Sequence, residues 1–317
     1  MPKTKIEWVQ NPDGSQGYTW NPITGCLNHV NGLCKGGGFP CYAYRLANGR
    51  LKQRYLANPN TSTSQIINDS PINMMQKQVK AEVDPFYPRF WEERLDEIWG
   101  LARSKYDKAR GIFLCDMSDL FGIGIPEEWT KSVLEAVKHA SPHRFYLLTK
   151  QAARLPQFSP FPDNCWVGVT CTNQTMVLEA TNHLYNHRIA KTQFLSIEPL
   201  LSWNTAHFSR PLTDNISKLD LDWLIIGAQT KPTKFPEISW VREIVNAADK
   251  AGIPVFLKDN LRGLLPKEPP FYTKCCAEVN GKDPCYEEPC LSEHLVDKCS
   301  KAPNFWQLRQ ELPSLRG

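Results

Sequence analysis

Residues 165–197 read CWVGVTCTNQTMVLEATNHLYNHRIAKTQFLSI and contain the clearest structural pattern in the chain. A short apolar run (165–170) is followed by a helix-compatible pattern (173–188) and by a second apolar run (192–197). Apolar runs separated by a helical pattern are typical of parallel strands that are buried on both faces and joined by a crossover helix. This stretch therefore predicts a βαβ unit.

The same alternation of apolar runs and helical patterns continues on both sides of this unit. We expect further helices at 127–140 and 237–251, and further strands at 18–22, 111–115 (GIFLC), 144–148 (RFYLL), 221–227 (LDWLIIG) and 253–257 (IPVFL). Six or seven mostly parallel strands in an α/β chain favour a partial (β/α) barrel over a complete eight-stranded one. A doubly wound sheet is the alternative.

The composition is that of a globular protein. The chain has 317 residues, of which 41% are hydrophobic and 22% charged, so it is long enough to bury a complete core. The longest apolar runs span about six residues, far fewer than the ~20 needed to cross a bilayer, and the first residues lack the apolar segment of a secretory signal. We therefore expect a cytoplasmic protein with no membrane partner. The net charge of +4 is too small to indicate nucleic acid by itself.

Two segments fall outside the strand and helix alternation. Residues 57–84 are mostly polar and rich in Asn and Ser, which predicts a surface loop or a lid. Residues 259–317 follow the last expected strand and are rich in cysteine and proline. We therefore expect a main domain at 1–258 that carries the 57–84 insert, and a C-terminal extension at 259–317 that does not fold separately.

Polar side chains follow most of the apolar runs. In parallel α/β folds the loops that leave the carboxyl ends of the strands build the site, so these residues are candidates for binding and proton transfer: Asp116, Ser118, Asp119, Thr149, Lys150, Cys171, Thr172, Glu198, Gln229, Thr230, Lys258 and Asp259. Helix capping is an equally good explanation for Ser118, Asp119 and Thr172. Pro199 disfavours helical geometry at Glu198, which favours a site role there.

Three of the eleven cysteines lie in one Gly- and Pro-rich loop that follows the first expected strand. Disulfides are rare in cytosolic proteins, so this cysteine content points to metal. Cys26, Cys34 and Cys41 can ligate three corners of a [4Fe-4S] cluster and leave one iron open. The alternatives are a structural zinc site completed by His29, or unliganded thiols. Zinc motifs usually have gaps of two to four residues, whereas the gaps here are seven and six, which favours the cluster.

Eight sequence blocks, in this order, make the chain resemble the three-cysteine-motif family of phage- and prophage-encoded proteins: KIEW, TWNPITGC, CYAYRLA, FLCDMSDLF, LLTK, WVGVT, FLSIEPLL and LIIGAQT. The resemblance covers residues 5–258 and implies a radical S-adenosylmethionine (SAM)-like partial barrel with an iron-sulfur loop at its mouth. Such proteins usually separate the second and third cysteines by two residues, and radical SAM enzymes use gaps of three and two residues. This chain inserts KGGGFP (35–40) instead.

The resemblance also implies roles for individual residues. Cys26, Cys34 and Cys41 match the cluster cysteines. Asp116, Ser118 and Asp119 lie in the loop that commonly receives the methionine part of SAM. Thr170, Glu198 and Gln229 fall on later strands, where contacts to the ribose and adenine are common. We therefore expect a [4Fe-4S] cluster and SAM as cofactors, with a ferredoxin or flavodoxin as the electron donor.

A second group of cysteines lies in the C-terminal extension, outside the resemblance: Cys276, Cys285, Cys290 and Cys299. Four thiolates can hold a second [4Fe-4S] cluster or a structural zinc, and free thiols are the third alternative. Cys115, Cys165 and Cys171 lie within or at the ends of apolar runs, so we expect them to be packing residues.

The leading hypothesis is a radical SAM enzyme that reductively cleaves SAM and modifies a macromolecular or nucleotide-type substrate, with nucleic acid weakly favoured. Lys150, Glu198 and Lys258 would then handle protons near the substrate. The rival is a non-catalytic iron-sulfur or zinc protein that binds nucleic acid or another partner on the same barrel. A metal-dependent hydrolase that uses Asp116, Asp119 and Glu198 is disfavoured, because no histidine accompanies these carboxylates at the strand ends.

Overall fold

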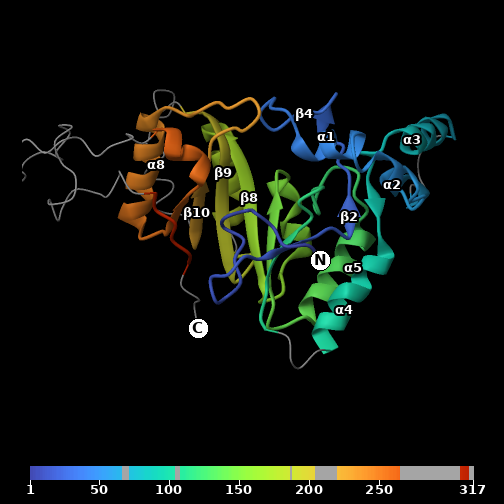
Figure 1. Cartoon of the computed structure of the whole chain (residues 1–317), viewed down its shortest axis with the longest axis horizontal. Coiled ribbons are helices and arrows are strands. Elements are labelled where there is room, and N and C mark those ends of the chain that lie inside the picture. Colours follow the sequence, from blue (N-terminus) through green and yellow to red (C-terminus); the bar gives the residue numbers. More distant parts are fainter. Residues whose placement is uncertain (66–70, 104–107, 186–187, 204–219, 265–307, 314–317) are drawn as a thin grey trace, which may run out of the picture.

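The computed structural model describes residues 1–65, 71–103, 108–185, 188–203, 220–264 and 308–313. Its main element is a seven-stranded sheet in which all neighbouring strands are parallel (Figure 1). In order across the sheet, the strands are β1 (Tyr18–Trp20), β6 (Gly111–Leu114), β7 (Arg144–Thr149), β8 (Cys165–Asn173), β9 (Thr192–Ser202), β10 (Trp223–Ile226) and β11 (Val255–Leu257). The expected parallel α/β architecture is confirmed.

The strands follow one another across the sheet in the order of the chain. Because parallel crossovers are right-handed, such an order places all the connecting helices on one face of the sheet. Four helices share one hydrophobic core with the strands on this helix-covered face: α4 (Leu95–Arg103), α5 (Glu127–Lys138), α6 (Gln174–Tyr185) and α8 (Ile238–Ala251). Among these seven strands the order does not reverse, so the doubly wound alternative is wrong.

The opposite face, here called the inner face, carries a separate aromatic cluster. Alternate strand residues point to it, and the cluster consists of Trp8, Val9, Phe113, Tyr146, Trp166, Phe194, Trp223, Ile225 and Phe256. Trp8 comes from the N-terminal segment, and its ring centroid lies 5.0 Å from that of Phe113 and 5.6 Å from that of Tyr146. Leu312, near the C-terminus, packs against the same cluster. Both ends of the chain thus help to cover the inner face.

The last described segment returns to the edge of the sheet beside β11. Gln310 forms an antiparallel bridge with Phe256, and the backbone of Glu311 donates to the Val255 carbonyl at 3.1 Å. The indole N–H of Trp223 donates to the Glu311 carbonyl at 2.8 Å. The predicted C-terminal extension therefore contributes to the main fold at residues 308–313. Cys276, Cys285, Cys290 and Cys299 lie outside the described residues.

Small elements join β1 to β6 and cover the carboxyl ends of the strands. They comprise β2 (Ile23–Thr24) with β5 (Arg89–Phe90), the hairpin of β3 (His29–Val30) and β4 (Leu33–Cys34), α1 (Tyr42–Asn48), α2 (Lys52–Leu56), η1 (Ser62–Gln65), α3 (Pro71–Val83) and η2 (Glu92–Arg94). The sequence predicts a surface loop or a lid at 57–84; this insert is not all loop, because it contains the 13-residue helix α3. Loops later in the chain contain η3 (Ala152–Arg154), η4 (Pro156–Phe158) and η5 (Asp259–Leu264).

Two central strands extend beyond their predicted ends. The β8–β9 ladder continues through the pairs Thr170–Ser196 and Cys171–Ile197, and β9 runs on to Ser202. Thr172 and Glu198 therefore lie within strands, not in the loops after them, and Thr172 is not a helix cap. None of the helices in the described ranges is long and apolar enough to cross a membrane.

Candidate functional site

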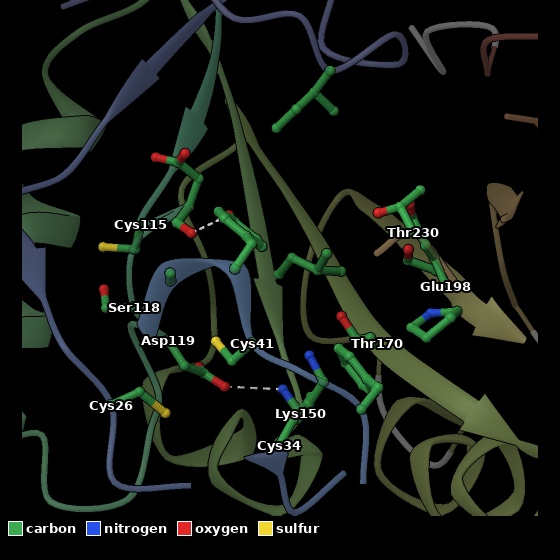
Figure 2. A pocket seen from close by; sticks show the side chains of 18 of the residues that line it. Cys26, Cys34, Cys41, Cys115, Ser118, Asp119, Lys150, Thr170, Glu198 and Thr230 are labelled. Carbon is green, nitrogen blue, oxygen red and sulfur yellow. Dashed lines mark hydrogen bonds between the residues drawn. The ribbon is translucent and has the colours of Figure 1, made fainter. Parts of the chain in front are cut away.

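A cavity of about 580 Å³ lies at the carboxyl ends of the strands (Figure 2). Its walls come from the cysteine loop, from strand ends across the sheet, and from the N-terminal segment. Every catalytic, cofactor and main-cluster residue predicted above lines it: Cys26, Cys34, Cys41, Asp116, Ser118, Asp119, Lys150, Thr170, Glu198, Gln229 and Lys258. Thr149 and Thr230 line it as well, whereas Cys171, Thr172 and Asp259 are not among its lining residues.

The glycines of the KGGGFP insert let the cysteine loop lie directly on β7 and β8. A Cβ atom on Gly36 would lie 2.9 Å from Cδ of Lys150, and one on Gly37 would lie 2.7 Å from Oγ1 of Thr172. Gly37 also has a φ of +124°, which favours glycine. The Thr172 hydroxyl donates to the Gly36 carbonyl at 3.3 Å. The insert therefore brings the loop close to the strand ends without crowding them.

Backbone N–H groups point at two of the three loop sulfurs. The N–H of Asn28 donates to Sγ of Cys26 at 3.3 Å, and the N–H groups of Ala43 and Tyr44 hydrogen-bond to Cys41. Burial nevertheless raises the pKa of Cys26 to about 12, with a further contribution from Asp119, and burial raises the pKa of Cys41. Both thiols are therefore protonated at neutral pH, and binding a metal must release their protons.

The three loop cysteines gather at the end of the cavity where Asp119 and Lys150 lie, away from Glu198 and Thr230 (Figure 2). Within the described residues, no group of three or more Cys, His, Asp or Glu side chains is arranged to hold a single metal ion.

His29 does not join the cysteines. Its Nδ1 accepts from the Gly32 N–H at 3.3 Å and its ring packs against Tyr44 and Phe86, so this arrangement gives the zinc alternative no support. A cluster spreads its cysteines over different iron atoms, and hydrogen bonds to the sulfurs are typical of its surroundings. Two of the three loop sulfurs, those of Cys26 and Cys41, already accept hydrogen bonds of this kind.

Asp119 ties the loop after β6 to the end of β7. Its Oδ1 accepts from the Thr149 hydroxyl at 2.7 Å and from the Phe121 N–H at 3.0 Å, and its Oδ2 accepts from the Lys150 N–H at 3.0 Å. Burial raises the pKa of this carboxyl despite these donors. The bond to Phe121 is the local turn contact that a capping residue makes, while the other two bonds set the position of Lys150 beside the cysteines.

Asp116 and Ser118 are also held by neighbouring elements. The Asn21 side chain donates to Oδ1 of Asp116 at 2.5 Å, and burial raises the pKa of Asp116. The Ser118 hydroxyl donates to the Ile23 carbonyl at 2.8 Å. Cys115, just before them, has a φ of +61°, which is uncommon for a residue other than glycine. This loop therefore has a fixed shape at the cavity wall.

An ion pair between Lys258 and Glu198 forms the wall farthest from the cysteines. The two side chains cross over Gly227, where a Cβ atom would lie 3.0 Å from Cγ of Glu198 and 3.1 Å from Cδ of Lys258. Glu7 lies close by and accepts the Asp259 N–H at 3.2 Å. Burial raises the pKa of Glu7, and the positive charge of Lys258 opposes this effect. One lysine thus lies between two carboxylates at this wall of the cavity.

Sequence reasoning missed several lining residues, among them Trp8 and Ser196. Trp8 and Ser196 are buried on the inner face, and both line the cavity. Ser196 lies between Phe194 and Glu198 in the alternation of β9, so the period of two along TQFLSIE was the signal. Treating residues 192–197 as one apolar run leaves the Ser196 hydroxyl out of the predicted site.

The fold and the cavity define an α/β protein with a cysteine-bearing site at the carboxyl edge of a parallel sheet. Residues 3–263 match the model of the family described as "Protein of unknown function (DUF5131)", and the chain belongs to this family. Comparison with curated proteins and with solved structures gives no match.

Proposed function

We propose that the chain is a radical SAM enzyme in which Cys26, Cys34 and Cys41 hold a [4Fe-4S] cluster at the mouth of the cavity. The observation that supports this most is that all three cysteines line one cavity together with the strand-end residues expected to bind SAM. When bound and reduced, such a cluster supplies an electron that splits SAM into methionine and a 5′-deoxyadenosyl radical, which takes a hydrogen atom from a substrate.

We further propose that the sheet is a partial (β/α) barrel and that the chain is related to the three-cysteine-motif proteins. Support for the barrel comes from the sequential strand order and from an inner face that is covered by the two ends of the chain. The proposal also includes a cytoplasmic location, a ferredoxin- or flavodoxin-type electron donor and a macromolecular or nucleotide-type substrate. A second cluster or zinc in the C-terminal extension remains part of it.

The hydrogen bonds and the ion pair around the cavity suggest a separate role for each of its polar residues. The hydroxyl of Ser118 and both oxygens of Asp119 are engaged within the protein, so these residues fix the loop that receives SAM. Asp116 uses Oδ1 for the Asn21 amide, and Gln229 uses Nε2 for the Pro232 carbonyl. Oδ2 of Asp116, Oε1 of Gln229 and the Thr170 hydroxyl would then orient the cofactor. Lys150 lies beside the cysteines, and the Lys258–Glu198 pair on the opposite wall holds a proton for transfer to or from the substrate.

Anaerobic reconstitution with iron and sulfide tests the cluster. We expect a brown protein with about four iron atoms bound through the loop, and loss of this iron in Cys26→Ala, Cys34→Ala and Cys41→Ala. Cys165→Ala is the matched control, because Cys165 is buried in β8 away from the cavity. Replacing Cys276, Cys285, Cys290 and Cys299 by alanine together separates iron bound in the extension from iron bound in the loop.

Dithionite and SAM are then added, and 5′-deoxyadenosine is measured by chromatography. The proposal predicts this product in the wild type and in Cys165→Ala, and its absence in the three loop variants. An intact cluster that repeatedly yields no 5′-deoxyadenosine would favour the rival, a non-catalytic iron-sulfur protein. Iron that stays bound in all three loop variants would contradict the assigned ligands.

A further inference from the structure

The floor of the cavity differs in character from its rim. Along the inner face, one level contains Leu148, Gly168 and Phe194 in register, and the next contains Thr170, Ser196 and Ile225. Of these residues, Leu148, Thr170 and Ser196 line the cavity. The charged residues lie toward the carboxyl ends of their strands: Lys150 directly follows β7, Glu198 is in β9, and Lys258 directly follows β11. Polarity therefore increases from aromatic rings through hydroxyls to charges along the depth of the site.

Two buried polar atoms of the floor have no hydrogen-bond partner among the described residues: Nε1 of Trp8 and Oγ of Ser196. The two residues are 2% and 1% exposed, and both line the cavity. A buried polar atom without a partner is costly and uncommon in folded proteins. Two such atoms in the lining of one cavity indicate that a ligand supplies their partners.

The chemistry of the floor restricts that ligand. A charged group would lose its hydration among Phe113, Leu148 and Ile6, and a sugar would bring more hydroxyls than Trp8 and Ser196 can satisfy. An alkyl group would leave the indole N–H and the serine hydroxyl unpaired. A flat heteroaromatic ring meets both requirements, because its faces are apolar and its edge carries hydrogen-bonding atoms.

We infer that the floor binds the nucleobase of the substrate, with the indole N–H of Trp8 donating to a ring or carbonyl acceptor and the Ser196 hydroxyl bonding to the same edge. This inference rests on the proposed function and names the substrate class of that site. SAM also carries a base, so adenine of the cofactor is the other source of the same chemistry. The experiment separates the two by saturating the protein with SAM.

Isothermal titration calorimetry is performed on the reconstituted holoenzyme with adenosine, guanosine, cytidine and uridine, with and without saturating SAM. At least one nucleoside is expected to bind in the presence of SAM. Ser196→Ala and Trp8→Phe are each expected to weaken that binding about fivefold, the effect of one lost neutral hydrogen bond. Trp203→Phe is the matched control, because Nε1 of Trp203 is also buried without a partner among the described residues but does not line the cavity.

Nucleoside binding that SAM abolishes would assign the floor to the cofactor and overturn the inference. Equal affinities of wild type, Ser196→Ala and Trp8→Phe would overturn it as well. If Trp8→Phe fails to fold, Ser196→Ala alone carries the test. SAM cleavage without nucleoside binding overturns this inference and leaves the proposed function standing. Nucleoside binding by a protein that never cleaves SAM overturns the proposed function instead.

Discussion

The two faces of the sheet are packed with different types of side chain. The helix-covered face is filled mainly by Val, Leu, Ile and Ala from strands and helices. The inner face has no helix in its cluster, among the described residues, and is filled mainly by aromatic rings from six strands and from Trp8. Large rings are needed there because only the terminal segments supply further packing atoms. The face that lacks helices is also the face with room for a cavity.

Trp223→Ala gives the largest expected effect and tests this difference directly. Trp223 is fully buried, its ring lies within 6.5 Å of five other aromatic rings, and its indole N–H holds Glu311. Four of the five neighbouring rings are fixed to strands and cannot close the space, so we expect a loss of about 5 kcal/mol in the free energy of unfolding. Chemical denaturation followed by circular dichroism measures it.

The matched substitution on the other face is Trp129→Ala in α5. Trp129 is 2% exposed and stacks on Phe90 at 5.3 Å between centroids. A helix can shift toward the space more easily than a strand, so we expect a smaller loss of about 3 kcal/mol. Equal losses in the two variants would show that the two faces relax alike.

Asp119→Asn is the next largest change and concerns a fully satisfied polar group of the cavity. An amide that turns its NH2 toward the Thr149, Phe121 or Lys150 donors loses an acceptor, which costs about 2 kcal/mol of unfolding free energy. Asp163→Asn, at an exposed position, is the control and should stay within about 0.5 kcal/mol. A loss no larger than in the control would mean that the loop after β6 does not depend on this carboxylate.

The pH dependence of stability in the wild type and in Asp119→Asn sharpens this prediction. Burial raises the pKa of Asp119 above its ordinary value of 3.8, so the folded chain binds this proton more tightly than the unfolded chain. The contribution of Asp119 is therefore fully present below pH 3.8 and falls as the pH rises through the folded pKa. Unfolding curves between pH 3 and pH 7 should show the advantage of wild type over Asp119→Asn shrinking. A growing advantage would contradict the assigned direction.

Gly37→Ala tests the contact between the cysteine loop and the sheet. The new Cβ would lie 2.7 Å from Oγ1 of Thr172, in addition to the strain at a φ of +124°. Gly38 also has a positive φ, of +71°, but has open space around its Cβ position, so Gly38→Ala reports the backbone strain alone, about 1 kcal/mol. We expect Gly37→Ala to lose more stability and more reconstituted iron than Gly38→Ala. Equal iron contents would show that the position of the loop does not matter for the cysteines.

Ser196→Ala gives the smallest effect and the opposite sign. Removing a buried hydroxyl without a partner among the described residues should raise the free energy of unfolding by about 1 kcal/mol. Thr130→Val is the contrasting variant, because the Thr130 hydroxyl, buried on the helix-covered face, donates to the Leu120 carbonyl at 2.9 Å. That variant should lose about 1 kcal/mol in the same denaturation experiment. A loss of stability in Ser196→Ala would mean that its hydroxyl is already bonded in the ligand-free protein.

Sequence patterns predicted the helix-covered face well. The apolar runs at 111–115, 144–148 and 165–170 mark strands β6, β7 and β8, and the pattern at 127–140 marks α5. A strand between two layers needs apolar residues on both sides, and that need is visible in the sequence. The polar insert 57–84 was less informative, because exposed Met75, Val79 and Val83 of α3 pack against no core that would select them.

The cavity was predicted from strand ends, and its floor was not. Lys150, Glu198 and Lys258 are polar residues at the ends of apolar runs. Parallel strands bring their carboxyl ends to the same edge of the sheet, however the helices pack. The roles of Trp8 and Ser196 in the cavity depend on contacts across the inner face, between residues almost 190 positions apart in the sequence. Such contacts depend on register, which a single strand does not reveal.

The return of residues 309–311 to β11 sets an order on assembly during synthesis. A chain emerges from the ribosome N-terminus first, and the residues of the helix-covered core are almost all made once Leu261 has appeared. Trp223 meets the Glu311 carbonyl only after the remainder of the chain has followed. The nascent protein therefore completes one hydrophobic layer early and leaves the other unfinished until residues 309–311 have been made.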